Sequence, residues 1–114
     1  MNATEVLAVE DELWFGGAEA YRRHLADDAL VVVPGASLDR DQTIAAIDQA
    51  PRWSGLERHD ERLLALGPSR LLVHYRAEAS RADGQSYRAL VSSVYQDASG
   101  RPQLVFHQQT PMPQ

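Results

Sequence analysis

Polar side chains interrupt the apolar face of a predicted β-hairpin in the last quarter of the chain, residues 87–111 (YRALVSSVYQDASGRPQLVFHQQTP). Our predicted pairing of its two strands puts Ser93 and Gln108 on the same face as Val91 and Phe106. A polar group that is buried without a partner costs about 1–3 kcal/mol. These side chains therefore belong either to a satisfied hydrogen-bond network or to a hydrated pocket, and the sequence leaves both open.

A pocket on this face would combine polar groups with aromatic walls. The hydroxyl of Tyr75, on the preceding strand, joins Ser93 and Gln108 in orienting a small polar or carboxylate-bearing molecule. Trp53 lies in a predicted loop and is the candidate lid, whereas Trp14 has helical spacing that also fits an ordinary core position. The predicted ligand-binding residues are Trp14, Tyr21, Trp53, Tyr75, Ser93 and Gln108.

Acid–base chemistry has three candidate residues, Tyr75, His107 and Asp28. His107 has the most suitable side chain, because its ordinary pKa lies near neutrality. The predicted register turns His107 to the outer face, together with His74, so it reaches the pocket only if that register shifts by one residue. Asp28 is placed at the mouth of the fold. No pair of histidines has metal-binding spacing, and we predict neither a metal nor a cofactor.

The composition excludes several other classes of protein. The 114 residues include 11 arginines, no lysine and no cysteine, and the net charge is −5. This excludes disulfides, thiolate nucleophiles and lysine Schiff bases, and it disfavours nucleic acid and anionic membranes as partners. The N-terminal segment carries acids within its apolar pattern and resembles neither a signal peptide nor a membrane span, so we expect a cytoplasmic protein.

Helices precede long strands along the chain, which is the order of an α+β fold. Apolar spacing predicts a first helix that is capped by Thr4 or Asn2 and runs to about Phe15, and a second over residues 18–25. A third helix is begun by a capping box at Asp39 and Gln42 and runs up to Pro51. We assign the acids of the first helix, Glu10 among them, to its solvent-facing side. Strands are predicted over residues 29–33, 56–66, 70–81, 86–96 and 102–110.

Two turns set the register of the last three strands. A three-residue loop, residues 82–84, with Gly84 in the left-handed conformation pairs Tyr75 with Val91. A four-residue loop, residues 97–100, pairs Ser93 with Leu104. We therefore predict one domain, residues 1–114, in which a cone-shaped, curved antiparallel sheet wraps over a long N-terminal helix and two shorter ones.

Several segments together resemble a known family. They are ELWFGG at the end of the first helix, the strand ALVVVPG, APRW after the third helix, the strand LLVHYRAEA and the ending SSVYQDASGRPQLVFHQQTP. Over residues 4–111 the chain resembles the SnoaL-like, domain-of-unknown-function branch of the nuclear transport factor 2-like superfamily. The resemblance implies a cone with an internal pocket and a homodimer packed through the outer face of the sheet.

Two functions follow as hypotheses. The first is a small-molecule-binding protein, with cofactor-free lyase- or isomerase-like catalysis left open. We find no aspartate on the predicted inner strand face, where isomerase-like relatives keep a general base. The second is a non-catalytic homodimerisation or accessory domain with a vestigial pocket. In either case the expected partner is a second copy of the chain, and the identity of a ligand is not encoded in any motif.

Overall fold

A computed structural model describes residues 1–113. The first helix begins where the sequence offers a cap, because the Asn2 side chain accepts a hydrogen bond from the Glu5 backbone N–H at 2.9 Å. Asp39 and Gln42 form the predicted capping box of the third helix. The elements are α1 (Ala3–Phe15), α2 (Gly17–His24), β1 (Leu25–Val33), β2 (Ala36–Leu38), α3 (Arg40–Gln49), β3 (Gly55–Ala65), β4 (Arg70–Ser80), β5 (Ser86–Ala98) and β6 (Arg101–Pro111).

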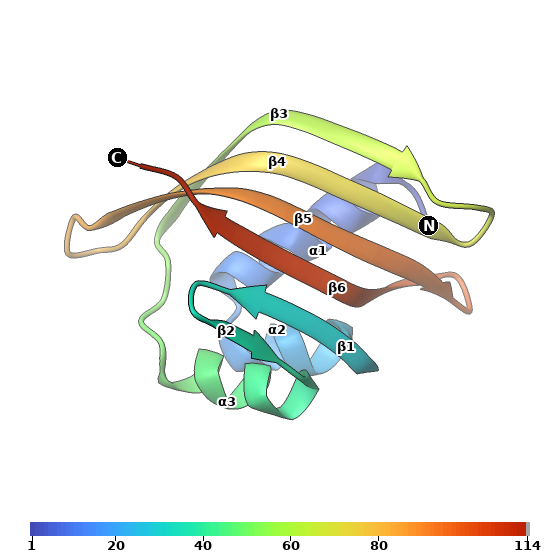
Figure 1. The fold of residues 1–114 in the computed structure, drawn as a ribbon, viewed down its shortest axis with the longest axis horizontal. Coiled ribbons are helices and arrows are strands. Elements are labelled where there is room, and N and C mark those ends of the chain that lie inside the picture. Colours follow the sequence, from blue (N-terminus) through green and yellow to red (C-terminus); the bar gives the residue numbers. More distant parts are fainter. Residues whose placement is uncertain (114) are drawn as a thin grey trace.

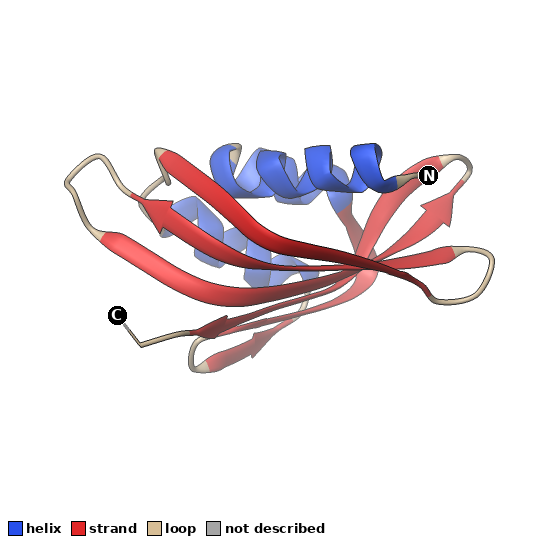
Figure 2. Cartoon of the chain, turned by 90° about the horizontal axis from the view of Figure 1, so that it is seen from above, coloured by secondary structure: helices blue, strands red, loops and turns tan. Residues whose placement is uncertain are grey.

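The strands within residues 1–113 form one six-stranded sheet in the order β2-β1-β6-β5-β4-β3 (Figure 1). Neighbours are antiparallel except β1 and β6, which run parallel. The sheet curves strongly, and the helices lie on its concave side (Figure 2). The predicted α+β cone is confirmed, with this one parallel pair added.

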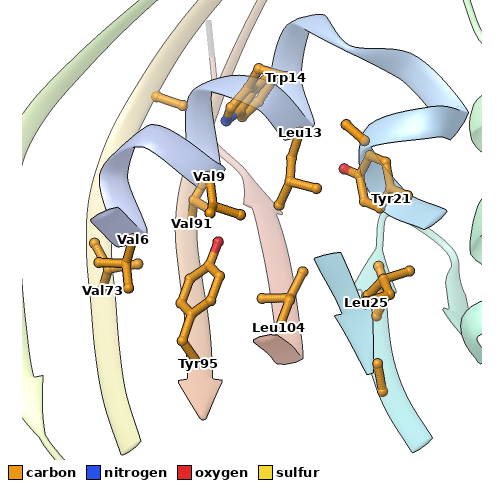
Figure 3. Close-up of a cluster of buried hydrophobic side chains, with 14 of the residues drawn as sticks. Val6, Val9, Leu13, Trp14, Tyr21, Leu25, Val73, Val91, Tyr95 and Leu104 are labelled. Carbon is orange, nitrogen blue, oxygen red and sulfur yellow. The ribbon is translucent and has the colours of Figure 1, made fainter. Parts of the chain in front are cut away.

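Helix α1 crosses the concave face and closes the core. Val6, Leu13 and Trp14 are buried against the sheet, at helical spacing. The Arg58 guanidinium on β3 pairs with Asp11, which ties the exposed flank of the helix to the edge of the sheet. Figure 3 shows Tyr95 rising from β5 toward this helix, between the flanking apolar side chains.

The register of the β4–β5 hairpin agrees with the prediction. Tyr75 pairs with Val91, and Arg81 N–H donates to the Gln85 carbonyl at 2.9 Å. Gly84 has φ +89°, the left-handed conformation that the three-residue loop requires. Tyr75 and Ser93 therefore both point to the concave side, where each is fully buried.

The predicted register of the β5–β6 hairpin is wrong, for two reasons. The turn has two residues, Ser99 and Gly100, both with positive φ (54° and 85°), so Leu104 pairs with Tyr95 and not with Ser93. A bulge at Val105 then adds one residue to β6. Beyond the bulge, each side chain of β6 therefore points to the face opposite to the one that was predicted.

The N-terminal half holds further differences. Strand β1 begins at Leu25, so Asp27 and Asp28 lie within it as exposed residues and do not end a helix. The short strand β2 follows the Pro34-Gly35 turn and pairs with β1, a pairing that its three residues did not reveal. None of the helices within residues 1–113 has the length and apolar character needed to cross a bilayer.

Candidate functional site

A cavity of about 420 Å³ opens at the end of the cone where α1 meets α2. Its walls come from the helices, from β1 and β2, from the segment after α3, from the turn end of the β4–β5 hairpin and from β6. The lining residues are Leu13, Trp14, Gly17, Tyr21, Val31, Val33, Pro34, Leu38, Thr43, Ala46, Ile47, Ala50, Pro51, Arg52, Trp53, Arg81, Gln85, Ser86, Tyr87 and Gln109. The volume falls in the range of small-molecule sites.

Three aromatic rings form one wall of this cavity. The Trp53 and Tyr87 rings stack with centroids 5.4 Å apart, and Trp14 meets Trp53 edge-on at 5.7 Å. The Arg81 guanidinium lies over the Trp53 ring, 4.2 Å from its centroid. The wall is therefore aromatic and is flanked by a cation.

A buried carboxylate lies beneath the wall. Glu10 on α1 is fully buried and accepts hydrogen bonds from the hydroxyls of Tyr75, at 2.6 Å, and Tyr95. The Tyr75 oxygen in turn accepts the Trp14 indole N–H at 2.9 Å. Burial, and then the Glu10 carboxylate, raises the pKa of Tyr75 and of Tyr95, so both phenols stay protonated at neutral pH.

A second polar chain runs along β6. His107 Nδ1 lies 2.7 Å from the Ser93 hydroxyl oxygen, and His107 Nε2 lies 3.1 Å from the Gln109 amide nitrogen. The other end of the Gln109 amide, its oxygen, accepts the Tyr87 hydroxyl at 3.1 Å. Burial lowers the pKa of His107, so the ring is neutral and serves as a hydrogen-bond bridge.

The residues predicted to bind a ligand divide into three groups in the structure. Trp14, Tyr21 and Trp53 line the cavity. Tyr75 and Ser93 lie beneath it, inside the two polar chains, and do not line it. Gln108 points to the convex face, because the bulge in β6 reverses its side.

The structure also relocates two of the candidate acid–base residues. His107 points inward beside Ser93, not outward beside His74. Asp28 is not at the mouth of the cone. It is exposed on β1 beside a shallow depression of the convex face, which it shares with Val94 and Phe106.

Sequence reasoning missed Glu10, Arg81 and Gln109. Glu10 had a visible signal, since it lies four residues from both Val6 and Trp14 and so shares their face of the helix. Gln109 had none, because its inward position depends on the bulge. Arg81 was treated only as the last residue of the predicted strand 70–81.

One group of side chains among residues 1–113 has the geometry to hold a cation. Glu57, His59 and Glu78 place ligand atoms within 4.8 Å of one another on the convex face, away from the cavity. The guanidiniums of Arg76 and Arg88 already lie 3.8 and 3.7 Å from the Glu78 carboxylate. These positive charges oppose a metal ion at the same carboxylate.

The fold and the cavity define a class of protein: an α+β cone with a ligand-sized opening at one end. No family model and no curated protein matches the sequence. Solved structures do match. An NTF2-like protein from Cytophaga hutchinsonii has a TM-score of 0.80 at 17% identity, over 98% of this chain and 100% of that one.

Two further structures agree. An NTF2-like protein of unknown function in nutrient uptake from Rhodospirillum rubrum has a TM-score of 0.82 at 16% identity, covering 97% of this chain and 98% of that one. The CaMKII hub homology domain of Chlamydomonas reinhardtii has a TM-score of 0.77 at 15% identity, covering 97% and 98%. The chain has the nuclear transport factor 2-like fold, as its sequence motifs suggested.

Proposed function

We propose that this protein binds a small organic molecule in the cavity at the open end of the cone. The observation that carries the proposal is the cavity itself, about 420 Å³ with a stacked aromatic wall and few polar groups. Sites of this size and character bury most of a drug-sized ligand. The polar chains behind the wall hold its shape, since Trp14 and Tyr87 each use their polar atom to bond inward.

Binding is favoured over acid–base catalysis by the state of the candidate groups. The Tyr75 hydroxyl is already engaged with both Trp14 and Glu10, and its raised pKa makes the phenol a poor proton donor and leaves the basic phenolate unpopulated at neutral pH. His107 is fully enclosed and bonded on both ring nitrogens. We therefore assign the cavity a binding role and attribute no reaction to it.

The test is a thermal-shift screen of small carboxylates, ketones and steroid-like compounds, followed by titration calorimetry of every hit. A ligand specific to the folded state raises the melting temperature in a concentration-dependent way. Val33 lines the cavity, so Val33→Phe should abolish binding of the hits. Val32 precedes Val33 on β1 and does not line the cavity, so Val32→Phe is the matched control. Hits that bind Val33→Phe unchanged would refute the proposal.

We also propose that two copies of the chain associate through the convex face. A row of apolar side chains runs across this face on five neighbouring strands, paired in register. Its members are Leu64, Leu72, Val94, Phe106 and Leu30. Leu64 is 50% exposed and Leu30 is 45% exposed.

The composition of the convex face favours a second copy as the occupant. Arg76, Glu78 and Arg88 lie on the same face as the row, so the surface presents both signs of charge to an identical partner. A structure with the same fold is named a hub homology domain, and this name supports the proposal of self-association. An interface with an apolar centre and a polar rim is the expected form.

Analytical ultracentrifugation tests this second proposal. Leu72 is in the middle of the row, so Leu72→Arg should shift the protein from dimer to monomer. Ser37→Arg adds the same charge at an exposed position on β2, outside the row, and should leave the dimer intact. A wild-type monomer at micromolar concentration would contradict the proposal.

A further inference from the structure

The cavity is positively charged in a protein whose net charge is −5. Two arginines, Arg52 and Arg81, line it, and no aspartate or glutamate is among its lining residues. Neither guanidinium lies within 4.0 Å of a carboxylate among residues 1–113, whereas most other arginines of the chain are paired in this way. The two cations are therefore available to an occupant of the cavity.

Arg81 is held in place by contacts that leave its donors unused. Its guanidinium lies on the Trp53 ring, and its side chain is partly buried. Its Nε is shielded from water and has no acceptor, and the guanidinium donates no hydrogen bond to any described residue. A shielded donor without an acceptor is energetically unfavourable. The guanidinium of Arg81 is thus positioned by the Trp53 ring, and its Nε–H lacks a hydrogen-bond acceptor.

Arg52 reaches the cavity from the segment after α3. Its guanidinium lies so close to Gly17 that a Cβ there would be 2.6 Å from Arg52 Nη2. Nη1 donates only a long bond, 3.3 Å, to the Phe15 carbonyl. The two arginines lie on adjoining segments, because Ser54 N–H donates to the Ser80 carbonyl at 2.8 Å. Both arginines therefore line the same cavity from neighbouring segments.

Of the residues that the structure describes, no charged side chain other than these two arginines lines the cavity, and the buried Glu10 carboxylate is separated from it by Trp14 and Tyr75. Tyr87 and Gln109 present a hydrogen-bonded pair of neutral groups, and His107 behind them is neutral because burial lowers its pKa. The Trp14, Trp53 and Tyr87 rings form the aromatic wall. The lining of the cavity thus combines two cations with an aromatic, uncharged surface.

We propose that the occupant is an organic monoanion: a carboxylate held at Arg81 and Arg52, attached to a flat apolar body that packs against the aromatic wall. This inference rests on the proposed binding function and specifies its ligand class. Guanidinium groups bind carboxylates through charge-assisted, often bidentate hydrogen bonds. Cationic molecules are disfavoured, because the lining offers them no carboxylate.

The experiment compares three probes of one shape: 2-naphthoate, 2-naphthamide and 2-naphthylmethylamine, which is a cation at neutral pH. Affinities are measured by titration calorimetry. Both tryptophans of the chain line the cavity, so a change in intrinsic fluorescence gives an independent readout of occupancy. We expect the naphthoate to bind about tenfold more tightly than the amide and the amine to bind most weakly, with the naphthoate weakened by added salt.

Variants at the arginines link this preference to the cavity. Arg81→Gln should lower naphthoate affinity about tenfold while leaving amide affinity nearly unchanged, and Arg52→Gln should act in the same direction. Arg101→Gln, an exposed arginine at the β5–β6 turn, makes the same change in net charge and should have no effect. Circular dichroism melts confirm that each variant is folded.

The outcomes separate this inference from the proposed function. Equal binding of naphthoate and amide, both abolished by Val33→Phe, would overturn the anion preference and leave the binding cavity intact. Naphthoate binding that survives Arg81→Gln and Arg52→Gln would also overturn it. If no probe binds the wild-type protein while other compounds of the thermal-shift screen do, the ligand class is wrong. If no compound binds at all, both the proposed binding function and the inferred preference for an anion are wrong.

Discussion

Removal of the Tyr75 hydroxyl tests whether the buried carboxylate network holds the cone together. This single oxygen donates to Glu10 at 2.6 Å and accepts the Trp14 indole N–H at 2.9 Å. A hydrogen bond to a charged group contributes about 1.5–3 kcal/mol, and an indole N–H left without an acceptor costs about 1–3 kcal/mol. Because such effects are not additive, we expect Tyr75→Phe to lower the free energy of unfolding by about 2–4 kcal/mol.

The matched control is Tyr87→Phe. Its hydroxyl donates a 3.1 Å bond to the Gln109 amide in a partly exposed position. A neutral bond of this kind contributes about 0.5–1.5 kcal/mol. Urea denaturation should therefore show a clearly larger loss for Tyr75→Phe than for Tyr87→Phe.

A double-mutant cycle with Glu10→Gln assigns the effect to the pair. The amide keeps the shape of the carboxylate and one acceptor oxygen, so the variant should fold with a loss of about 1–2 kcal/mol. Direct contact between Tyr75 and Glu10 predicts a coupling energy of about 1–3 kcal/mol. A coupling near zero, or equal losses for the two tyrosine variants, would falsify the reasoning.

Two further predictions concern the folded state. Burial holds the pKa of His107 below its unfolded value, so the unfolded chain binds the extra proton and stability should fall as pH drops below about 6.5, by up to about 1.4 kcal/mol per pH unit. Urea denaturation between about pH 5 and 7 should show this slope in the wild type and in the control His59→Gln, and a flatter one in His107→Gln; equal slopes in all three would rule it out. Gly17→Ala forces an L-residue into φ +66° and also against Arg52, whereas Gly67→Ala meets a positive φ (+81°) but open space. Left-handed strain alone costs about 1–2 kcal/mol, so Gly17→Ala should be the more destabilising of the two in the same assay, and equal losses would exclude the Arg52 contact as a cause.

Local signals were sufficient to predict most elements of the fold. Helical apolar spacing, the Asp39–Gln42 capping box and the Gly84 loop each determine a structure within a few residues, and the structure confirms all three. Strand β2 was missed because its three residues owe their conformation to pairing with β1. Intrinsic β-propensity says little about whether so short a segment forms a strand.

The candidate site was harder to predict, because it depends on one residue of register. The β6 bulge at Val105 turns His107 inward and Gln108 outward, and no local rule distinguishes a bulged strand from a regular one in this sequence. The error over Glu10 had a different origin. Its position four residues from Val6 and from Trp14 indicated burial, but its charge led us to assign it to the surface.

Glu10 and the cavity are connected through Trp14. The indole ring lines the cavity, while its N–H is fixed by Tyr75, whose own hydroxyl is fixed by Glu10. The orientation of one wall of the cavity is thus set by a carboxylate that does not itself line the cavity. The effect of this buried polar network is to give the tryptophan a single orientation. The hydrogen-bond network that closes the core therefore also supports one wall of the cavity, so the core network and the cavity are adjacent layers of one structure.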